Sequence, residues 1–378
     1  MSVLLLPALI IALFFIYRTL YHRYWNRGLL VGLTFDRATA VEGEHAGLSE
    51  VIANYGFIPL HILQISFRTA NGLRFENAEN ETVSDRTSVS DVFSLGRREK
   101  VTRSLDVRCE KRGYYRIIAT SVQGHDLFSQ QIHYIDRSQN TALSVLPGRL
   151  SPEHYDLPLS RLFGDIVVKS SLFEDNLSLR GIREYSETDP QSSVNWKATA
   201  HTGSLKVNLH DRTAGQRLVI LLNTEAPSAL FNGDLLEDSI RLAGTLADEA
   251  CRWDIPVRLS SNAPDTLTNS PRKTEFGASA QHCASILGLL ARMDLTQPQA
   301  VFADILAEEL AETEEDRQGL CYIIISTSIR EHSTTAIKHF AREVSSVTWL
   351  SPVSPDMPEP SLSEADLSHI EYIRMVRR

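Results

Sequence analysis

The carboxyl-terminal half of the chain alternates aliphatic runs with amphipathic segments. Leu218 to Leu222 reads LVILL, an uninterrupted run typical of a parallel strand covered by helices on both faces. Apolar residues then recur at helical spacing from Asp234 to Trp253, and "IPVRLSS" from Ile255 predicts the next strand. This order indicates a doubly wound α/β sheet, with any functional site at the carboxyl ends of its strands.

The pattern continues to about residue 352. Helices are predicted over 278–293, 298–312 and 331–344, and strands at "CYIIIST" and "VTWLSP". Because Pro and Ser dominate the stretch that follows, we expect residues 353–378 to be a flexible tail.

The first folded region has a different pattern. From Leu29 to Tyr134 short segments with partial two-residue alternation are separated by turns such as Asn71-Gly72, without helical segments between them. This spacing predicts an all-β immunoglobulin-like sandwich over 28–145, followed by the α/β domain over 146–352.

The amino terminus carries an uncharged run, VLLLPALIIALFFIY, from Val3 to Tyr17. Its helical length of roughly 22 Å is short for a ~30 Å hydrocarbon core, but flanking aromatic and arginine side chains favour a transmembrane anchor over 1–20. A signal peptide is the alternative, although no basic residue precedes the run. Arg18, Arg23 and Arg27 follow the run, so the positive-inside rule predicts a single-pass inner-membrane protein with its folded domains in the cytoplasm.

Composition narrows the class of function. The chain has 378 residues and a formal net charge of -9, which argues against nucleic-acid binding. Its four cysteines, Cys109, Cys251, Cys283 and Cys321, are widely separated and lack metal-ligand spacing, so reduced structural thiols are expected.

One segment, residues 183–203, is unusually dense in charged and polar side chains. It reads REYSETDPQSSVNWKATAHTG, and we call it the signature segment. Asp189 and Pro190 predict a helix start, Gly203 predicts its end, and the helix is expected to bury Trp196. The following "SLKVNLHD" alternates as a half-buried strand does.

"LRGIREY", the Asp-Pro pair and "VNWKATAHTGSLKV" together resemble the motifs of the domain of unknown function 58 family. "KRGYYRI" and "GHDLFS" resemble that family's sandwich domain. This sequence departs from the pattern at Glu187-Thr188, Ser193 and His201, which replace the family's Pro-Gly and two arginines.

The resemblance implies a bacterial, membrane-anchored protein with a von Willebrand factor A-like α/β domain of Rossmann type. It also implies a MoxR-type AAA+ ATPase as partner. The residues that would form its structural and interaction site are Arg180, Arg183, Glu184, Tyr185, Asp189, Asn195, Trp196 and Lys197.

Domains of the von Willebrand type bind a divalent ion through an Asp-x-Ser-x-Ser loop after their first strand. The aligned loop here offers Asn223, Glu225 and Ser228, a degenerate set with one carboxylate, so we expect no metal and no other cofactor.

We therefore expect a non-enzymatic, membrane-anchored scaffold or adaptor, working with the ATPase in assembly or chaperone-like envelope function. One alternative is a metal-dependent binding module. Another is a hydrolase using Asp189 or Glu184 with His201 or His210, although no nucleophile is paired with these groups.

Overall fold

The computed structural model describes the chain except at residues 1, 77–80, 84–85, 127–131, 151–178, 185–194, 197–198, 201–202, 211–216, 227–232, 314–316, 318, 345–346 and 378. It divides into two compact units. Unit 1 is Met1–Gly148 with Leu287–Met293, and unit 2 is Arg149–Ile286 with Asp294–Arg378.

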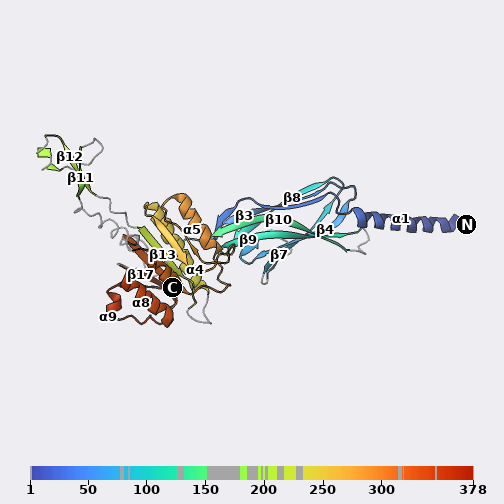
Figure 1. Cartoon of the computed structure of the whole chain (residues 1–378). Helices are drawn as coiled ribbons and strands as arrows, with labels where there is room; N and C mark the ends of the chain where they lie inside the picture. The colour runs from blue at the N-terminus through green and yellow to red at the C-terminus, as the bar shows by residue number, and fades with distance from the viewer. Residues whose placement is uncertain are drawn as a thin grey trace. The chain divides into compact units, whose positions relative to one another are not determined.

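Unit 1 begins with helix α1 (Ser2–Tyr24), which the prediction assigned to a membrane anchor (Figure 1). Within the described residues, no helix has the length and hydropathy needed to span a bilayer. Pro7 interrupts the apolar run. At the end of α1 the side chain of Tyr21, and that of Trp25 just after the helix, are buried in a core cluster with strand residues such as Leu63. The predicted anchor over 1–20, and with it the single-pass inner-membrane location, is therefore wrong.

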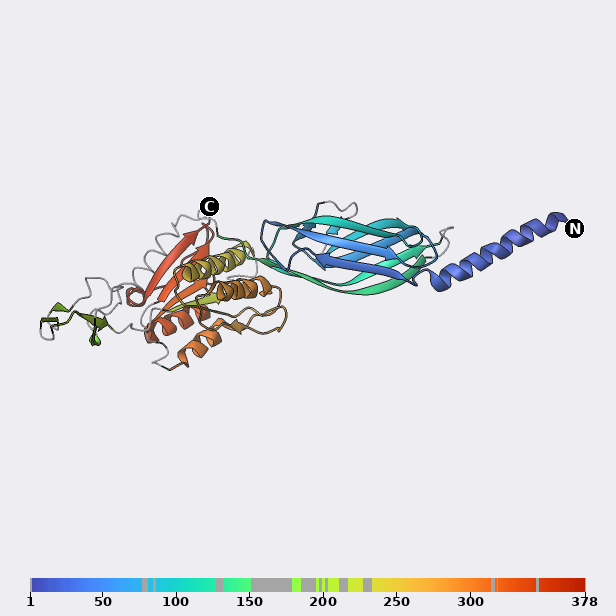
Figure 2. The same ribbon diagram turned by 90° about the horizontal axis from the view of Figure 1, so that it is seen from above.

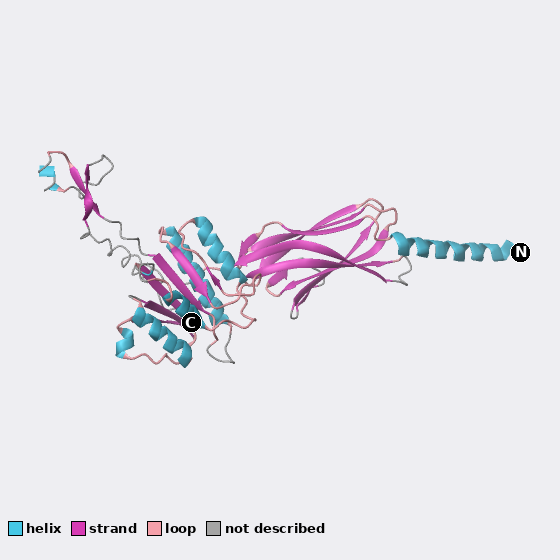
Figure 3. Ribbon diagram, viewed as in Figure 1, coloured by secondary structure: helices cyan, strands magenta, loops and turns pink. Residues whose placement is uncertain are grey.

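After α1, two facing β-sheets form the body of unit 1 (Figure 3). The smaller has the order β1 (Leu29–Phe35), β3 (His45–Asn54), β8 (Lys100–Cys109), β5 (Leu73–Phe75). The larger has the order β2 (Thr39–Val41), β10 (Ile132–Leu146), β9 (Gly113–His125), β4 (Leu60–Ala70), β7 (Arg86–Leu95), β6 (Glu81–Val83).

Alternate residues of both sheets fill one core. Leu48 and Leu105 come from the smaller sheet, and Phe67, Ile117 and Val145 from the larger, all at most 2% exposed. Their neighbours along each strand are more exposed, so the alternation visible in the sequence is the alternation between the inside and outside of a β-sandwich.

A carboxylate pair interrupts this apolar core. Glu50 on β3 and Asp91 on β7 point inward from opposite sheets and are 1% and 3% exposed. Arg103 pairs with Asp91 at 2.7 Å between Nη1 and Oδ1, and it lies directly opposite Glu50 in the β3–β8 register. Burial, together with the charge of Asp91, raises the pKa of Glu50 to about 7 against the opposing effect of Arg103.

This pKa predicts an unusual pH dependence for the sandwich. Because Glu50 binds its proton more tightly in the folded state than in the unfolded chain, its contribution to stability is complete below pH 4.5 and is lost as the pH rises to about 7. The loss should be on the order of 3 kcal/mol at most. Hydrogen exchange of β3 and β8, measured across this range, should show the decline in the wild type and not in Glu50→Gln. An equal decline in both proteins would rule out Glu50 as its source.

Unit 2 contains a six-stranded sheet with helices beside it (Figure 2). Its order is β15 (Arg272–Lys273), β14 (Val257–Ser261), β13 (Arg217–Asn223), β16 (Leu320–Ser326), β17 (Val347–Val353), β18 (Ile370–Val376). All neighbours pair in parallel except β15, which is antiparallel to β14. Its helices are α4 (Asp234–Arg252), the first half of α5 (Ala280–Arg292), α6 (Phe302–Leu310), α8 (Glu331–Glu343) and the short α9 (Glu364–Leu367); the second half of α5 is assigned to unit 1.

The helices bury the aliphatic strands. Phe302 of α6 and Phe340 of α8 share a core cluster with Leu221 and Trp349 of the sheet. The amphipathic α4 packs against β13 through residues such as Ile240, which is fully buried.

The carboxyl terminus differs from the flexible tail expected over 353–378. Residues 370–376 form β18 beside β17, and α9 begins with a capping box in which Ser363 and Asp366 bond reciprocally. The Pro- and Ser-rich stretch dominated the sequence pattern and concealed the apolar positions of "IEYIRMV" after it.

Candidate functional site

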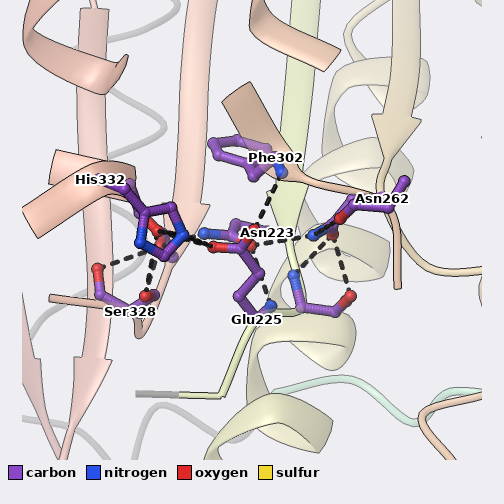
Figure 4. Close-up of polar contacts among 10 residues, drawn as sticks. Asn223, Glu225, Asn262, Phe302, Ser328 and His332 are labelled. Carbon is purple, nitrogen blue, oxygen red and sulfur yellow. Dashed lines mark hydrogen bonds and ion pairs between the residues drawn. The ribbon is translucent and has the colours of Figure 1, made fainter. Parts of the chain in front are cut away.

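Polar side chains gather at the carboxyl ends of three parallel strands of unit 2 (Figure 4). Asn223 ends β13, Asn262 follows β14, and Ser326 ends β16. All three are fully buried. Because parallel strands end at one edge of a sheet, segments far apart in the sequence meet here.

The asparagines hold these loops together. Asn223 donates from Nδ2 to Ser326 Oγ at 3.0 Å, and its Oδ1 accepts from the Glu225 backbone N–H at 2.9 Å. Asn262 Oδ1 accepts from both the N–H and the hydroxyl of Thr224 at 2.9 Å. Asn262 Nδ2 donates to Asn223 Oδ1 at 3.2 Å. The side-chain amides of Asn223 and Asn262 thus form hydrogen bonds with each other and with the neighbouring backbone and hydroxyl groups.

Glu225 is the one carboxylate among the residues labelled in Figure 4, and both of its oxygens accept hydrogen bonds. Its Oε1 accepts from the backbone N–H of Phe302, the first residue of α6, at 2.9 Å. Its Oε2 accepts from Ser333 Oγ at 2.6 Å and lies 3.3 Å from His332 Nε2. The side chain is 12% exposed, so Glu225 joins β13 to the amino termini of α6 and α8, where a negative charge is favourable.

Ser333, His332 and Glu225 are the residue types of a hydrolase catalytic triad, but their geometry differs from that of a triad. His332 Nε2 lies 3.2 Å from Ser333 Oγ and also faces Glu225, so one ring nitrogen meets both groups. A catalytic triad needs the serine and the carboxylate on different nitrogens of the imidazole. Ser333 moreover donates directly to Glu225, which leaves the histidine no proton to accept from it.

The hydrolase alternative gains no support from the described residues of the signature segment and the strands beside it. Glu184 pairs with Lys206 at one end of a two-stranded ladder and His210 pairs with Leu179 at the other. Five residues of strand, roughly 16 Å, separate these ends. Asp189 and His201, the other expected pair, lie outside the described residues.

The degenerate metal loop was also a prediction of the sequence. Asn223 Oδ1 and both Glu225 oxygens accept hydrogen bonds from protein donors, and Ser228 lies outside the described residues. A divalent ion would have to displace those donors from the one carboxylate, so the donor set does not fit Mg²⁺.

Among the described residues, one group has the composition of a metal site. His45, Glu76 and Asp106 offer ligand atoms within 4.8 Å of one another on the outer face of the smaller sheet of unit 1. His45 Nδ1 lies 3.2 Å from Asp106 Oδ1, and an exposed ion pair accounts for this contact without a metal.

Thiol chemistry is unfavourable at the buried cysteines. Burial raises the pKa of Cys109 to about 11 and that of Cys283 to about 12, so both stay protonated at neutral pH.

Five of the predicted site residues lie in, or between, the strands of a separate two-stranded element. Strands β11 (Leu179–Glu184) and β12 (Lys206–His210) pair antiparallel, which places Arg183 and Glu184 in the ladder and Arg180 at a register shift. Asn195 and Trp196 lie in the connection between these strands, whereas Tyr185, Asp189 and Lys197 lie outside the described residues.

Trp196 is held by a hydrogen-bonded turn. The Asn195 N–H donates to the Lys206 carbonyl at 2.8 Å, and the Thr199 N–H donates to the Asn195 carbonyl at 2.9 Å. Gly203 follows with φ +72°, the left-handed conformation expected where the helix ends. The expected burial of Trp196 is wrong: its side chain is 69% exposed, because this two-stranded element does not enclose it.

No protein-family model and no curated protein matches the chain. Among solved structures, a non-cellulosomal cohesin from Archaeoglobus fulgidus is 11% identical, covers 31% of this chain and 91% of its own, and has a TM-score of 0.22. The CARDB domain of a Pyrococcus furiosus protein is 14% identical, with coverages of 29% and 93% and a TM-score of 0.19. The conserved hypothetical protein BatB from Bacteroides thetaiotaomicron is 17% identical, with coverages of 43% and 92% and a TM-score of 0.30.

The structure corrects the predicted fold class, a von Willebrand factor A-like domain preceded by an immunoglobulin-like sandwich and one transmembrane helix. Among the described residues more lie in strands than in helices, and no helix among them qualifies as a membrane span. Alternating strands and helices predict a layered sheet, and many unrelated α/β proteins share such a sheet. The membrane and von Willebrand descriptions are therefore withdrawn. The resemblance to the domain of unknown function 58 family and the MoxR-type partner stay predictions.

Proposed function

We propose that this protein is a non-catalytic interaction scaffold and that the turn bearing Trp196 contacts a partner protein. The main observation behind this proposal is that the Trp196 side chain is 69% exposed on a turn fixed by backbone hydrogen bonds. A large aromatic ring exposed on an ordered turn costs little conformational entropy when it is buried by a partner, and tryptophan is enriched at binding hot spots.

The arrangement at the strand edge supports the same proposal. At the place where α/β sheets usually carry out chemistry, the polar groups of this chain bond to one another. Glu225 acts as a structural link between elements, and among the described residues no activated nucleophile accompanies it.

Trp196→Ala should lower recovery of the partner at least tenfold, because truncating a hot-spot tryptophan costs about 2 kcal/mol or more. The measurement is quantitative affinity purification of the full chain from the cells that produce it. Trp253→Ala is the matched control, since Trp253 is 61% exposed in the same unit. Equal recovery with both variants would refute the proposed contact.

A further inference from the structure

The outer face of the larger sheet of unit 1 contains a shallow groove of about 600 Å³. It lies over strands β9, β4 and β7, which are neighbours in that sheet (Figure 1). Arg68, Arg86, Arg116 and Tyr114 are among its lining residues. This face is separate from the strand edge and from the Trp196 turn, which both belong to unit 2.

Strand alternation places these side chains outside. On β4, Phe67 and Thr69 are 2% and 3% exposed in the core, whereas Arg68 and Ala70 between and after them are exposed. Arg86 on β7 lies directly opposite Ala70. The small Ala70 side chain thus leaves open space beside an arginine.

A β-bulge in the larger sheet also shapes the groove. Between the pairs Ser138–Ala119 and Thr141–Ile117, strand β10 carries one more residue than β9, and Ile118 lies at this bulge. A bulge increases the local twist of a sheet and redirects its side chains. Ile118 is 62% exposed and contributes an apolar wall to the groove.

The arginines of the groove are not engaged in ion pairs among the described residues. Within the described part of the chain, Arg68, Arg86 and Arg116 form no ion pair and no side-chain hydrogen bond, whereas Arg103 pairs with a carboxylate. Asp136 also lines the groove, and no ion pair joins it to them. Three guanidinium groups therefore line one hollow of a chain whose net charge is -9.

We propose that this groove binds an acidic peptide segment of a partner protein in an extended conformation. Guanidinium groups bind carboxylates through two parallel hydrogen bonds. Alternate side chains of an extended peptide recur about 6.6 Å apart on one side, which lies between one and two strand spacings of about 4.8 Å. Arg68 lies opposite Ser88, two residues along β7 from Arg86, so the backbones of these arginines are about 8 Å apart. The long arginine side chains can bridge the difference from about 6.6 Å, so carboxylates at every second position can meet both, and Tyr114 and Ile118 cover the peptide backbone.

Fluorescence anisotropy of the full chain tests this proposal with a labelled ten-residue peptide of alternating Ser and Glu. A peptide of alternating Ser and Gln is the control ligand. Each of Arg68→Gln, Arg86→Gln and Arg116→Gln should raise the Kd for the Ser–Glu peptide about fivefold or more. Arg108→Gln should leave it within twofold, because Arg108 is an exposed arginine of the opposite sheet with the same change of charge.

Several results would overturn the proposal. One is binding that responds equally to Arg108→Gln, which would indicate general electrostatic attraction. Another is binding of the Ser–Gln peptide with equal affinity. A third is displacement of the peptide by inorganic phosphate at the same concentration as by unlabelled peptide, which would make the groove a site for small anions. Absence of any Ser–Glu peptide binding at low salt would also overturn it.

Discussion

Replacing Glu309 by alanine should destabilise unit 2 by about 3–5 kcal/mol, the usual cost of removing one partner from a buried ion pair. Glu309 on α6 is 1% exposed and pairs with Arg258 of β14, whose side chain is 7% exposed. Arg258 also pairs with Glu312 at 2.8 Å and lies over the ring of Phe276 at 4.4 Å. Without Glu309 its charge would stay buried with a single, more exposed carboxylate.

Lys273 of β15 completes this cluster. Its Nζ lies 2.9 Å from Glu309 Oε1 and 2.7 Å from Glu312 Oε1. Burial opposes its charged form, yet hydrogen bonds to both carboxylates hold the pKa of Lys273 above its usual value. The cluster thus connects α6 to two strands at one edge of the sheet.

A double-mutant cycle measures the pair directly. Stability should be read from hydrogen exchange of β13 and β14, with Glu308→Ala as the control because Glu308 is an exposed neighbour on the same helix. Glu309→Leu combined with Arg258→Met should cost much less than the sum of the single losses, since the double change leaves no unpaired buried charge. Additive losses would show that the two residues do not depend on each other.

Replacing Glu225 by alanine should destabilise the same unit by about 3 kcal/mol. The substitution removes two charge-assisted hydrogen bonds and leaves the Phe302 N–H and the Ser333 hydroxyl without their acceptor. Glu225→Gln should cost less, because its amide oxygen still accepts one of these bonds.

Hydrogen exchange of the backbone amides of β13 and β16 measures this loss of stability, and Glu308→Ala is again the control variant. A structural link predicts that Glu225→Ala accelerates exchange in both strands. Unchanged exchange, or a divalent ion that stabilises the wild type through Glu225, would contradict the structural role.

Much of the secondary structure of unit 2 follows from local chemistry. The aliphatic run LVILL forms β13, because a strand buried on both faces has apolar residues at every position. The apolar residues after Asp234 form α4, because a helix buried on one face has apolar residues at a spacing of three to four. "CYIII" likewise becomes β16. Strand β18 was missed because its stabilisation comes from pairing with β17, a partner that local sequence does not reveal.

The sites were harder to predict than the strands. Glu225 stood out only as a poor substitute for a metal ligand, and its actual partners, Phe302 and Ser333, are distant in sequence. Trp196 was expected to be buried on the basis of helical periodicity, yet periodicity does not tell whether another element covers a face. The arginine groove depends on strand register, which brings Arg68, Arg86 and Arg116 together from three strands.

The central claim is that this chain works by contact with another protein through the Trp196 turn. A photo-crosslinking amino acid placed at position 196 of the full chain, and at position 253 as the control, tests it most directly in the cells that produce the protein. The proposal predicts one dominant cross-linked partner at position 196 and a much lower yield of it at 253. Equal yields at the two positions, or no specific product at 196, would contradict it.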